Sequence, residues 1–259
     1  MSHNIKFHSA VKSSFRKTAV GLTLIFAVNA GFAAPGLTNA SHPDDAAHEG
    51  NPVSHVHTQE VGHQQSPVDL SPTMNAGLSL IDIDYASVPL NVINDGHTVQ
   101  VKYPAGSKMS INGQSFELMQ FHFHAPSEYT IEGKRFDMEV HLVHKDSKGN
   151  LGVIGILIEE GVENKTASKI WDHFQSPENG IASHPQVEIN ASGLLPKKMD
   201  HYELMGSLTT PPYTEGVQWY VMKEPIQLST DQIAQFKAAF KPNARSIQNT
   251  NGRPIVLNY

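Results

Sequence analysis

The chain carries the stretch Gln-Phe-His-Phe-His at residues 120–124 and the stretch Glu-Val-His at residues 139–141. Successive side chains of a β-strand point to opposite faces, so His122 and His124 share one face and the two phenylalanines share the other. An antiparallel partner strand through His141 brings a third imidazole to the same point. Three neutral imidazole nitrogens around one centre, with a fourth position open, are the ligand set of a catalytic zinc ion.

Two polar residues flank these histidines at a spacing that suits support of a metal ligand. Gln120 and Glu139 each lie two residues from a histidine on the same strand face, placed to accept the ring N–H that a ligand does not use. A His-x-His pair alone is weak evidence, because most such pairs are surface histidines or hydrogen-bonded core histidines. The third histidine, with an acid two residues before it, favours the metal, but spacing alone leaves both interpretations open.

Size and charge restrict the class of protein. The chain has 259 residues, with 19 basic and 25 acidic side chains and a net charge of −6 at pH 7. This length predicts one domain of about 200 residues with a proper core, preceded by a leader. The acidic balance and the lack of a basic stripe argue against nucleic acid as a partner.

Residues 1–33 have the pattern of a secretory signal peptide. Four basic residues precede an apolar run at residues 19–28, which is too short to span a bilayer, and small residues follow. Cleavage is expected after Ala33 or Ala30, which predicts an exported protein, periplasmic or secreted; an uncleaved membrane anchor is the alternative. Removal leaves 15 basic against 25 acidic residues, a charge of −10, which predicts no stable association with anionic membranes.

Residues 34–60 predict a flexible N-terminal arm. They contain three prolines, few large apolar residues and several histidines, a composition that does not build a core. The arm is either a solvated linker, which we favour, or a histidine tract that gathers zinc. The chain has no cysteine, so its fold does not depend on disulfides.

Residues 61–259 predict a mainly β domain of the α+β class. Two peripheral helices are expected, over 166–175 and over 230–240, the second with Ser229 or Thr230 as its N-cap. Asn112-Gly113, Glu132-Gly133 and Lys148-Gly149-Asn150 are hairpin signals. The strand candidates are 78–85, 88–94, 98–103, 107–112, 115–124, 136–144, 151–159 and 216–223.

Six sequence blocks occur in the order and at the spacings of one enzyme family. They are Gln-Ser-Pro-Val (65–68), Asn-Asp-Gly-His (94–97), Gln-Phe-His-Phe-His-Ala-Pro-Ser-Glu (120–128), Glu-Val-His-Leu-Val-His (139–144), Gly-Ser-Leu-Thr-Thr-Pro-Pro (206–212) and Asn-Gly-Arg-Pro (251–254). Together they resemble the α-class carbonic anhydrases, in particular the exported bacterial type. The resemblance implies one catalytic domain around a twisted, mostly antiparallel central sheet of about ten strands.

The resemblance also implies the chemistry. A zinc lyase of this family holds one Zn²⁺ per chain, here on His122, His124 and His141, and reversibly hydrates carbon dioxide to bicarbonate and a proton through zinc-bound hydroxide. Zinc lowers the pKa of its bound water into the neutral range, an effect for which the carbonic anhydrases are the standard example. Thr209 is expected to orient the hydroxide by donating to Glu128. The alternatives are that Thr209 is an ordinary turn residue and that Glu128 is a buried structural acid.

Further residues follow from the same resemblance. His97 matches the proton shuttle, with Asp95 beside it expected to slow proton release; a turn histidine is the alternative. Gln120, Glu139 and the Asn251 carbonyl match the partners of the three ligands. The expected contacts for CO₂ or bicarbonate, which ordinary core packing also explains, are Val143, Val153, Leu208, Thr210, Val217 and Trp219.

The chain departs from the family at two places. No Trp or Tyr lies between residues 34 and 64, and Leu204 stands where relatives usually have a tyrosine. These departures keep a second hypothesis open: a catalytically weak or silent relative that binds zinc or another ligand. The three intact histidines favour the enzyme. Relatives of this type suggest a possible homodimer, but no interface can be identified from the sequence.

Overall fold

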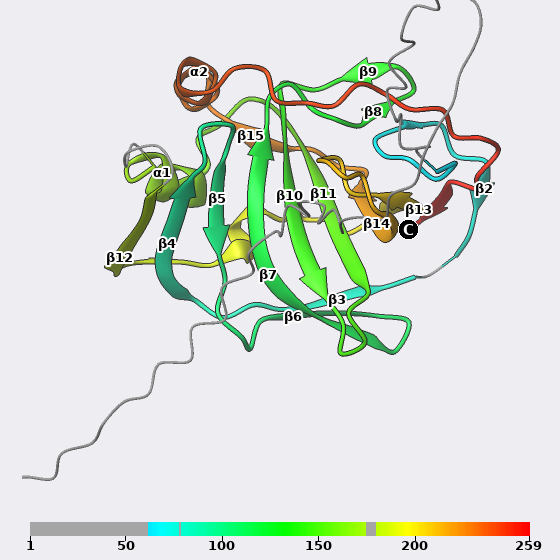
Figure 1. Cartoon of the computed structure of the whole chain (residues 1–259), viewed down its shortest axis with the longest axis horizontal. Coiled ribbons are helices and arrows are strands. Elements are labelled where there is room, and N and C mark those ends of the chain that lie inside the picture. The colour runs from blue at the N-terminus through cyan, green and yellow to red at the C-terminus, as the bar shows by residue number, and fades with distance from the viewer. Residues whose placement is uncertain (1–61, 78, 175–179) are drawn as a thin grey trace, which may run out of the picture. The chain divides into compact units, whose positions relative to one another are not determined.

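The computed structural model describes residues 62–77, 79–174 and 180–259 (Figure 1). The predicted signal peptide at 1–33 and the predicted arm at 34–60 lie outside these residues. The described part is mainly β, and thirteen of its strands join in one twisted sheet. The mainly β class with a large central sheet is therefore confirmed.

Ten strands of this sheet follow one path of neighbours, and the remaining three attach beside it. β15 (Ile226–Leu228) pairs with β11, β6 (Lys108–Ile111) pairs with β7, and β3 (Ile81–Asp84) pairs with β6. The path runs β12 (Gly180–Ile189), β4 (Val88–Asn94), β5 (Val99–Lys102), β7 (Gln114–His124), β10 (Met138–Lys145), β11 (Leu151–Glu160), β14 (Glu215–Met222), β13 (His201–Ser207), β16 (Val256–Asn258) and β2 (Met74–Asn75).

Most strand pairs are antiparallel, as expected. In the described part of the large sheet, only β11–β14, β11–β15 and β16–β2 are parallel. A second, small sheet joins β1 (Asp69–Leu70), β8 (Thr130–Ile131) and β9 (Lys134–Arg135). Asn112-Gly113 and Glu132-Gly133 each have two positive φ angles, the backbone that a two-residue hairpin turn requires.

Two α-helices lie at the β4–β12 end of the sheet in the described part (Figure 1). Asn164 caps α1 (Lys165–Trp171), and Ser229 forms a capping box with Gln232 at the start of α2 (Thr230–Ala239). A short 3₁₀ turn, η1 (Ala191–Leu194), follows β12. Neither α-helix is long and apolar enough to cross a membrane.

The two faces of the central strands are covered differently. Phe121 and Phe123 point into the larger core, where the Phe123 ring lies 4.8 Å from that of Trp171 and 6.3 Å from that of Phe236. Full burial of one such side chain contributes roughly 1.5–3 kcal/mol. This packing fixes the orientation of β7, so His122 and His124 must face the other side of the sheet.

Candidate metal centre

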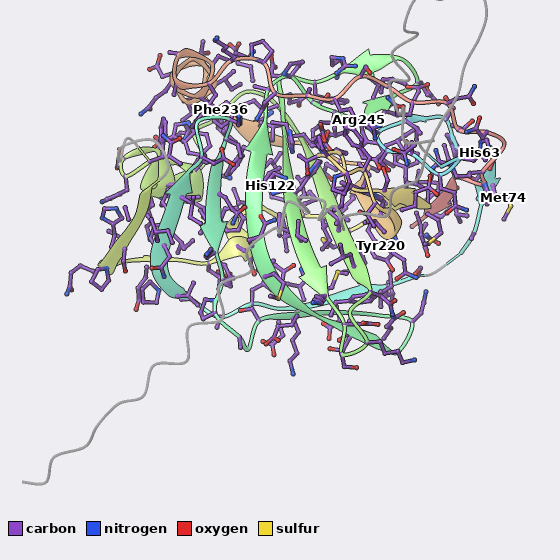
Figure 2. The ribbon with its side chains drawn as sticks, in the orientation of Figure 1. His63, Met74, His122, Tyr220, Phe236 and Arg245 are labelled. Atoms are coloured by element: carbon purple, nitrogen blue, oxygen red, sulfur yellow. The ribbon has the colours of Figure 1, made fainter. Side chains whose placement is uncertain are left out.

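Strand register brings the three predicted histidines together. In the antiparallel β7–β10 pair, His122 lies directly opposite His141, and His124 lies opposite Glu139. One ring nitrogen from each of His122, His124 and His141 lies within 4.8 Å of those of the other two. Figure 2 shows His122 on β7, in the middle of the sheet. The sheet therefore presents three imidazoles to one point.

Two of the histidines have one nitrogen fixed by the predicted partner. Gln120 Oε1 lies 2.9 Å from His122 Nδ1, and Glu139 Oε1 lies 2.8 Å from His141 Nε2. These oxygens accept, so the ring N–H sits on the bonded nitrogen. His122 Nε2 and His141 Nδ1 are left with their lone pairs for a metal ion.

The third histidine has a different partner from the one expected. His124 Nδ1 lies 3.3 Å from the backbone oxygen of Asn243, whereas the Asn251 side chain donates to the His63 carbonyl. The prediction for Asn251 is therefore wrong. Asn243 is held in place because its side chain also accepts from Ala125 N at 2.8 Å. Both asparagines lie in an irregular segment, so no local pattern distinguishes them.

The chemistry of the site fits a zinc ion. His124 Nε2 is buried and has no hydrogen-bond partner. Such a nitrogen costs free energy unless a ligand binds to it. Burial lowers the pKa of all three imidazoles, that of His141 to about 4 and that of His122 well below its usual value. Neutral imidazoles are the form that binds a metal ion.

Glu139 supports more than its histidine. Its Oε2 accepts from the backbone N–H groups of Glu128 at 2.8 Å and Tyr129 at 2.9 Å. Burial raises the pKa of Glu139 to about 7, and the hydrogen bond from Tyr129 opposes that rise. One carboxylate thus fixes the tautomer of His141 and the backbone that carries Glu128.

Glu128 lies beside the histidines and has one carboxylate oxygen without a hydrogen-bond partner. Its Oε1 accepts from the backbone N–H of Arg245 at 2.8 Å, and its Oε2 is buried, unpartnered and 3.9 Å from His141 Nδ1. Thr209 is buried just after β13, but no hydrogen bond joins it to Glu128 within the described residues. The expected Thr209–Glu128 hydrogen bond is thus not formed.

The predicted apolar wall is assembled across three neighbouring strands. Val143 pairs with Val153, and Val153 pairs with Trp219. The Trp219 ring lies 4.8 Å from the His141 ring, so the wall adjoins the metal centre. Val217 and Leu208 belong to the same apolar cluster, as does Leu204, whereas Thr210 is exposed.

His97 lies in the exposed turn between β4 and β5. The His97 backbone N–H donates to Asp95 Oδ1 at 2.9 Å, and the His97 carbonyl accepts from Asn243 Nδ2 at 3.0 Å. Asn243 therefore links the turn of the predicted shuttle to the strand of His124. Asp95 acts as the cap of this turn.

Arg245 is a residue that the sequence did not single out. Its Nη1 donates to Gln65 Oε1 at 2.9 Å and to the Ser66 carbonyl at 2.6 Å. Its guanidinium lies 3.7 Å from the centre of the Tyr213 ring, a cation–π contact. The backbone of Arg245 thus binds Glu128, while its side chain contacts the loop that follows Thr209. No sequence signal indicates this role.

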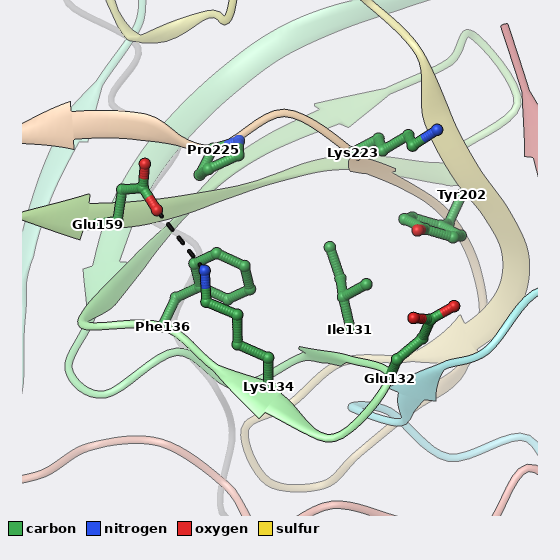
Figure 3. Close-up of a pocket in the computed structure, with 8 residues that line it drawn as sticks. All are labelled: Ile131, Glu132, Lys134, Phe136, Glu159, Tyr202, Lys223 and Pro225. Carbon is green, nitrogen blue, oxygen red and sulfur yellow. Dashed lines mark ion pairs between the residues drawn. The ribbon is translucent and has the colours of Figure 1, made fainter.

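A separate hollow of about 630 Å³ is not the metal centre (Figure 3). Lys134 reaches toward Glu159 there, with Nζ–Oε2 at 3.7 Å, and lies over the Phe136 ring. None of the predicted site residues lines it. Its lining consists of Ile131, Glu132, Lys134, Phe136, Glu159, Tyr202, Lys223 and Pro225.

Comparison with known proteins identifies the class. Residues 52–259 match the family model of eukaryotic-type carbonic anhydrases. A carbonic anhydrase of Klebsiella pneumoniae is 40% identical over 203 residues, covering 77% of this chain and 82% of the relative. A fold built on this sheet, with three converging histidines, belongs to the α-class carbonic anhydrases, and the chain is a member of that family.

Solved structures agree with this assignment. A hyperthermostable carbonic anhydrase from an active hydrothermal vent chimney is 44% identical with a TM-score of 0.74, covering 77% of this chain and 90% of that one. The α-carbonic anhydrase of Thermovibrio ammonificans, in complex with the inhibitor sulfanilamide, is 37% identical with a TM-score of 0.73, covering 76% and 88%. The chain is a carbonic anhydrase.

Proposed function

We propose that this enzyme reversibly hydrates CO₂ with one zinc ion held by His122 Nε2, His124 Nε2 and His141 Nδ1. The observation that carries the proposal is the hydrogen bonding of the three rings. Each imidazole has its other nitrogen fixed by an oxygen, from Gln120, Asn243 or Glu139. Such partners set the tautomer and the ring orientation of metal ligands.

The chain's own groups would hold the reactants in place. A bound zinc ion supplies Lewis acidity, which makes hydroxide available from water near neutral pH. Glu128 Oε2 is a buried acceptor beside His141, so it would orient the reacting water by accepting a hydrogen bond from it. Fixed orientation of this kind removes part of the entropic barrier to reaction.

The apolar wall suits the other reactant. CO₂ is small and carries no hydrogen-bond donor, so a surface of Val143, Val153 and Trp219 can hold it without leaving a polar group unsatisfied. This wall adjoins His141 through the Trp219 ring. The substrate would therefore meet the water at the edge between the histidines and the apolar cluster.

The proton that hydration releases must leave the site. We propose His97 as the group that takes it at a ring nitrogen and passes it to buffer. Histidine both accepts and releases a proton near neutral pH, and the His97 side chain is exposed. The Asn243 bond to its carbonyl keeps this turn close to the strand of His124.

Stopped-flow CO₂ hydration, with zinc counted in the same sample, tests the proposal. We expect one zinc per chain, fast hydration, inhibition by sulfanilamide, and loss of both zinc and hydration in His124→Ala. His63→Ala, which removes an exposed histidine away from the triad, serves as the matched control. One zinc per chain without hydration would refute the enzymatic proposal and favour a relative that only binds zinc or another ligand.

We also propose export, based on the leader at residues 1–33 and the charge of −10 that remains after it. N-terminal sequencing of the protein recovered from its source cells tests this directly. A mature N-terminus after residue 30 or 33 supports export. An intact Met1 on a protein recovered from the cytosol would refute it.

A further inference from the structure

Two more histidines form a pair outside the metal centre. His173 follows the end of α1, and His184 lies on β12, the terminal strand of the sheet beside that helix (Figure 1). Their ring centroids are 4.4 Å apart and the ring planes meet at 61°. Neither histidine is fully exposed. In the order of the sheet, strands β4 and β5 lie between β12 and β7, the strand that carries His122 and His124.

Each ring of this pair has one nitrogen whose hydrogen bonding is defined. His173 Nδ1 lies 2.8 Å from the Lys169 carbonyl. A carbonyl only accepts, so Nδ1 carries the hydrogen and Nε2 keeps its lone pair. His184 Nε2 is buried and has no hydrogen-bond partner. A buried nitrogen without a partner calls for an explanation, and a bound ion is one.

The backbone around the pair is held in position. Lys169 Nζ donates to the Glu188 carbonyl at 2.8 Å, which fastens α1 to β12. The β12–β4 register shifts between His184 and Glu188. Such irregularities redirect side chains and are frequent beside functional sites. The same Lys169 therefore accepts from His173 through its carbonyl and anchors the strand of His184 through its ammonium group.

We propose that His173 and His184 form a second metal site for a late first-row divalent ion. Imidazole suits Cu²⁺, Ni²⁺ and Zn²⁺, and Cu²⁺ binds most tightly in this series. Among the described residues, His122, His124 and His141 are the only group of three or more His, Cys, Asp or Glu side chains with converging ligand atoms. The described residues thus leave the remaining coordination positions of the pair to water. The inference does not depend on the proposed function.

Copper titration of the full-length, zinc-loaded enzyme tests the site. Bound Cu²⁺ is counted after equilibration at fixed free Cu²⁺, with zinc measured in the same sample. We expect His184→Ala and His173→Ala each to bind one copper ion fewer than the unmodified chain, or to bind it at least tenfold more weakly. Zinc content and CO₂ hydration should not change. His63→Ala is the matched control, and we expect it to retain the ion.

Two further measurements separate this pair from other copper-binding groups. Histidines before residue 62 bind copper equally in all variants, so equal copper in His184→Ala and the unmodified chain would overturn the proposal. Pulsed electron paramagnetic resonance on the unmodified enzyme should show about one more copper ion per chain with two imidazole ligands than either variant shows. If the variants fail to fold, the unmodified enzyme alone decides. Absence of a two-imidazole copper population in it would overturn the proposal.

Discussion

Two buried histidines, three residues apart on β10, face different regions of the molecule. They differ in how many of their ring nitrogens have a hydrogen-bond partner. His144 has both nitrogens satisfied, with Tyr85 Oη 2.7 Å from Nε2 and the Gly152 carbonyl 3.3 Å from Nδ1. His141 has only Nε2 satisfied, by Glu139 at 2.8 Å. The first is part of the larger core, and the second faces the metal centre.

Burial does not separate the two, because it lowers the pKa of each to about 4. The number of satisfied nitrogens does separate them. His201 follows the pattern of His144: it is buried, with Met199 O at Nδ1 and Asn258 Nδ2 at Nε2. A buried histidine with two partners maintains the fold, and one with a spare nitrogen is available to a ligand.

The largest expected effect comes from removing each histidine of β10 in turn. His141→Ala should release zinc and lower CO₂ hydration by more than the roughly 10–100-fold that is typical of losing only a ligand's partner. His144→Ala should keep one zinc per chain and instead lose about 1–3 kcal/mol of stability, because the Tyr85 hydroxyl stays buried without a partner. Zinc counting and urea unfolding measure both. Equal zinc loss in the two variants would contradict the comparison.

Acid should act on the His144 region through linkage. Its folded-state pKa of about 4 lies below the usual 6.5, so the unfolded chain binds more protons between these values. The free energy of unfolding should thus fall as the pH drops from about 6.5 toward 4, with His144 contributing up to roughly 3 kcal/mol of that loss. Urea unfolding of the zinc-free protein across this range measures it.

The control for this acid effect is His144→Phe. The metal ligands are the same in both proteins, so the difference between the two pH profiles isolates His144. We expect the variant to lose less stability on acidification. Parallel profiles would show that His144 does not contribute.

Removing the partner of one ligand sharpens the comparison on the side of the metal. Gln120→Ala leaves His122 Nδ1 without its acceptor, which sits at 2.9 Å. Zinc affinity should fall by roughly 10–100-fold, and competition with a chelator measures it. Gln114→Ala, on the same strand but bonded to Asp146, is the control. An unchanged affinity would mean that the His122 tautomer is set in another way.

The smallest expected effect is at Arg245. Arg245→Lys keeps the charge but loses the planar group that contacts Gln65 and Tyr213. We expect a stability loss of about 0.5–2 kcal/mol and a several-fold lower kcat with zinc retained, because the backbone N–H that holds Glu128 loses the side-chain contacts that anchor it. Tyr213→Leu should reproduce part of the loss. Unchanged kcat in both variants would limit Arg245 to stability.

Regular patterns could be predicted from the sequence, and irregular segments could not. Strand 88–94 was predicted with the bounds that β4 has, because its apolar residues alternate. β12 was missed because this edge strand is largely exposed and contains Pro185. β13 was missed because its buried positions include His201 and Ser207, which conceal the alternation.

The same distinction holds at the metal centre. Spacing on two strands placed His122, His124 and His141 together, because strand geometry has a fixed period. Asn243 and Arg245 act from a segment without regular structure, and no period relates such a segment to a strand. Their contacts follow from tertiary packing, which local sequence does not encode.

The role of that irregular segment also has a consequence in time. The chain leaves the ribosome from its N-terminus, and 119 positions separate His124 from the Asn243 carbonyl that orients it. Similarly, 117 positions separate Glu128 from the backbone N–H of Arg245 that binds it. A nascent chain that has released β7 and β10 thus carries all three histidines but neither of these supports. The metal centre can reach its final form only after residues 243–245 have been made.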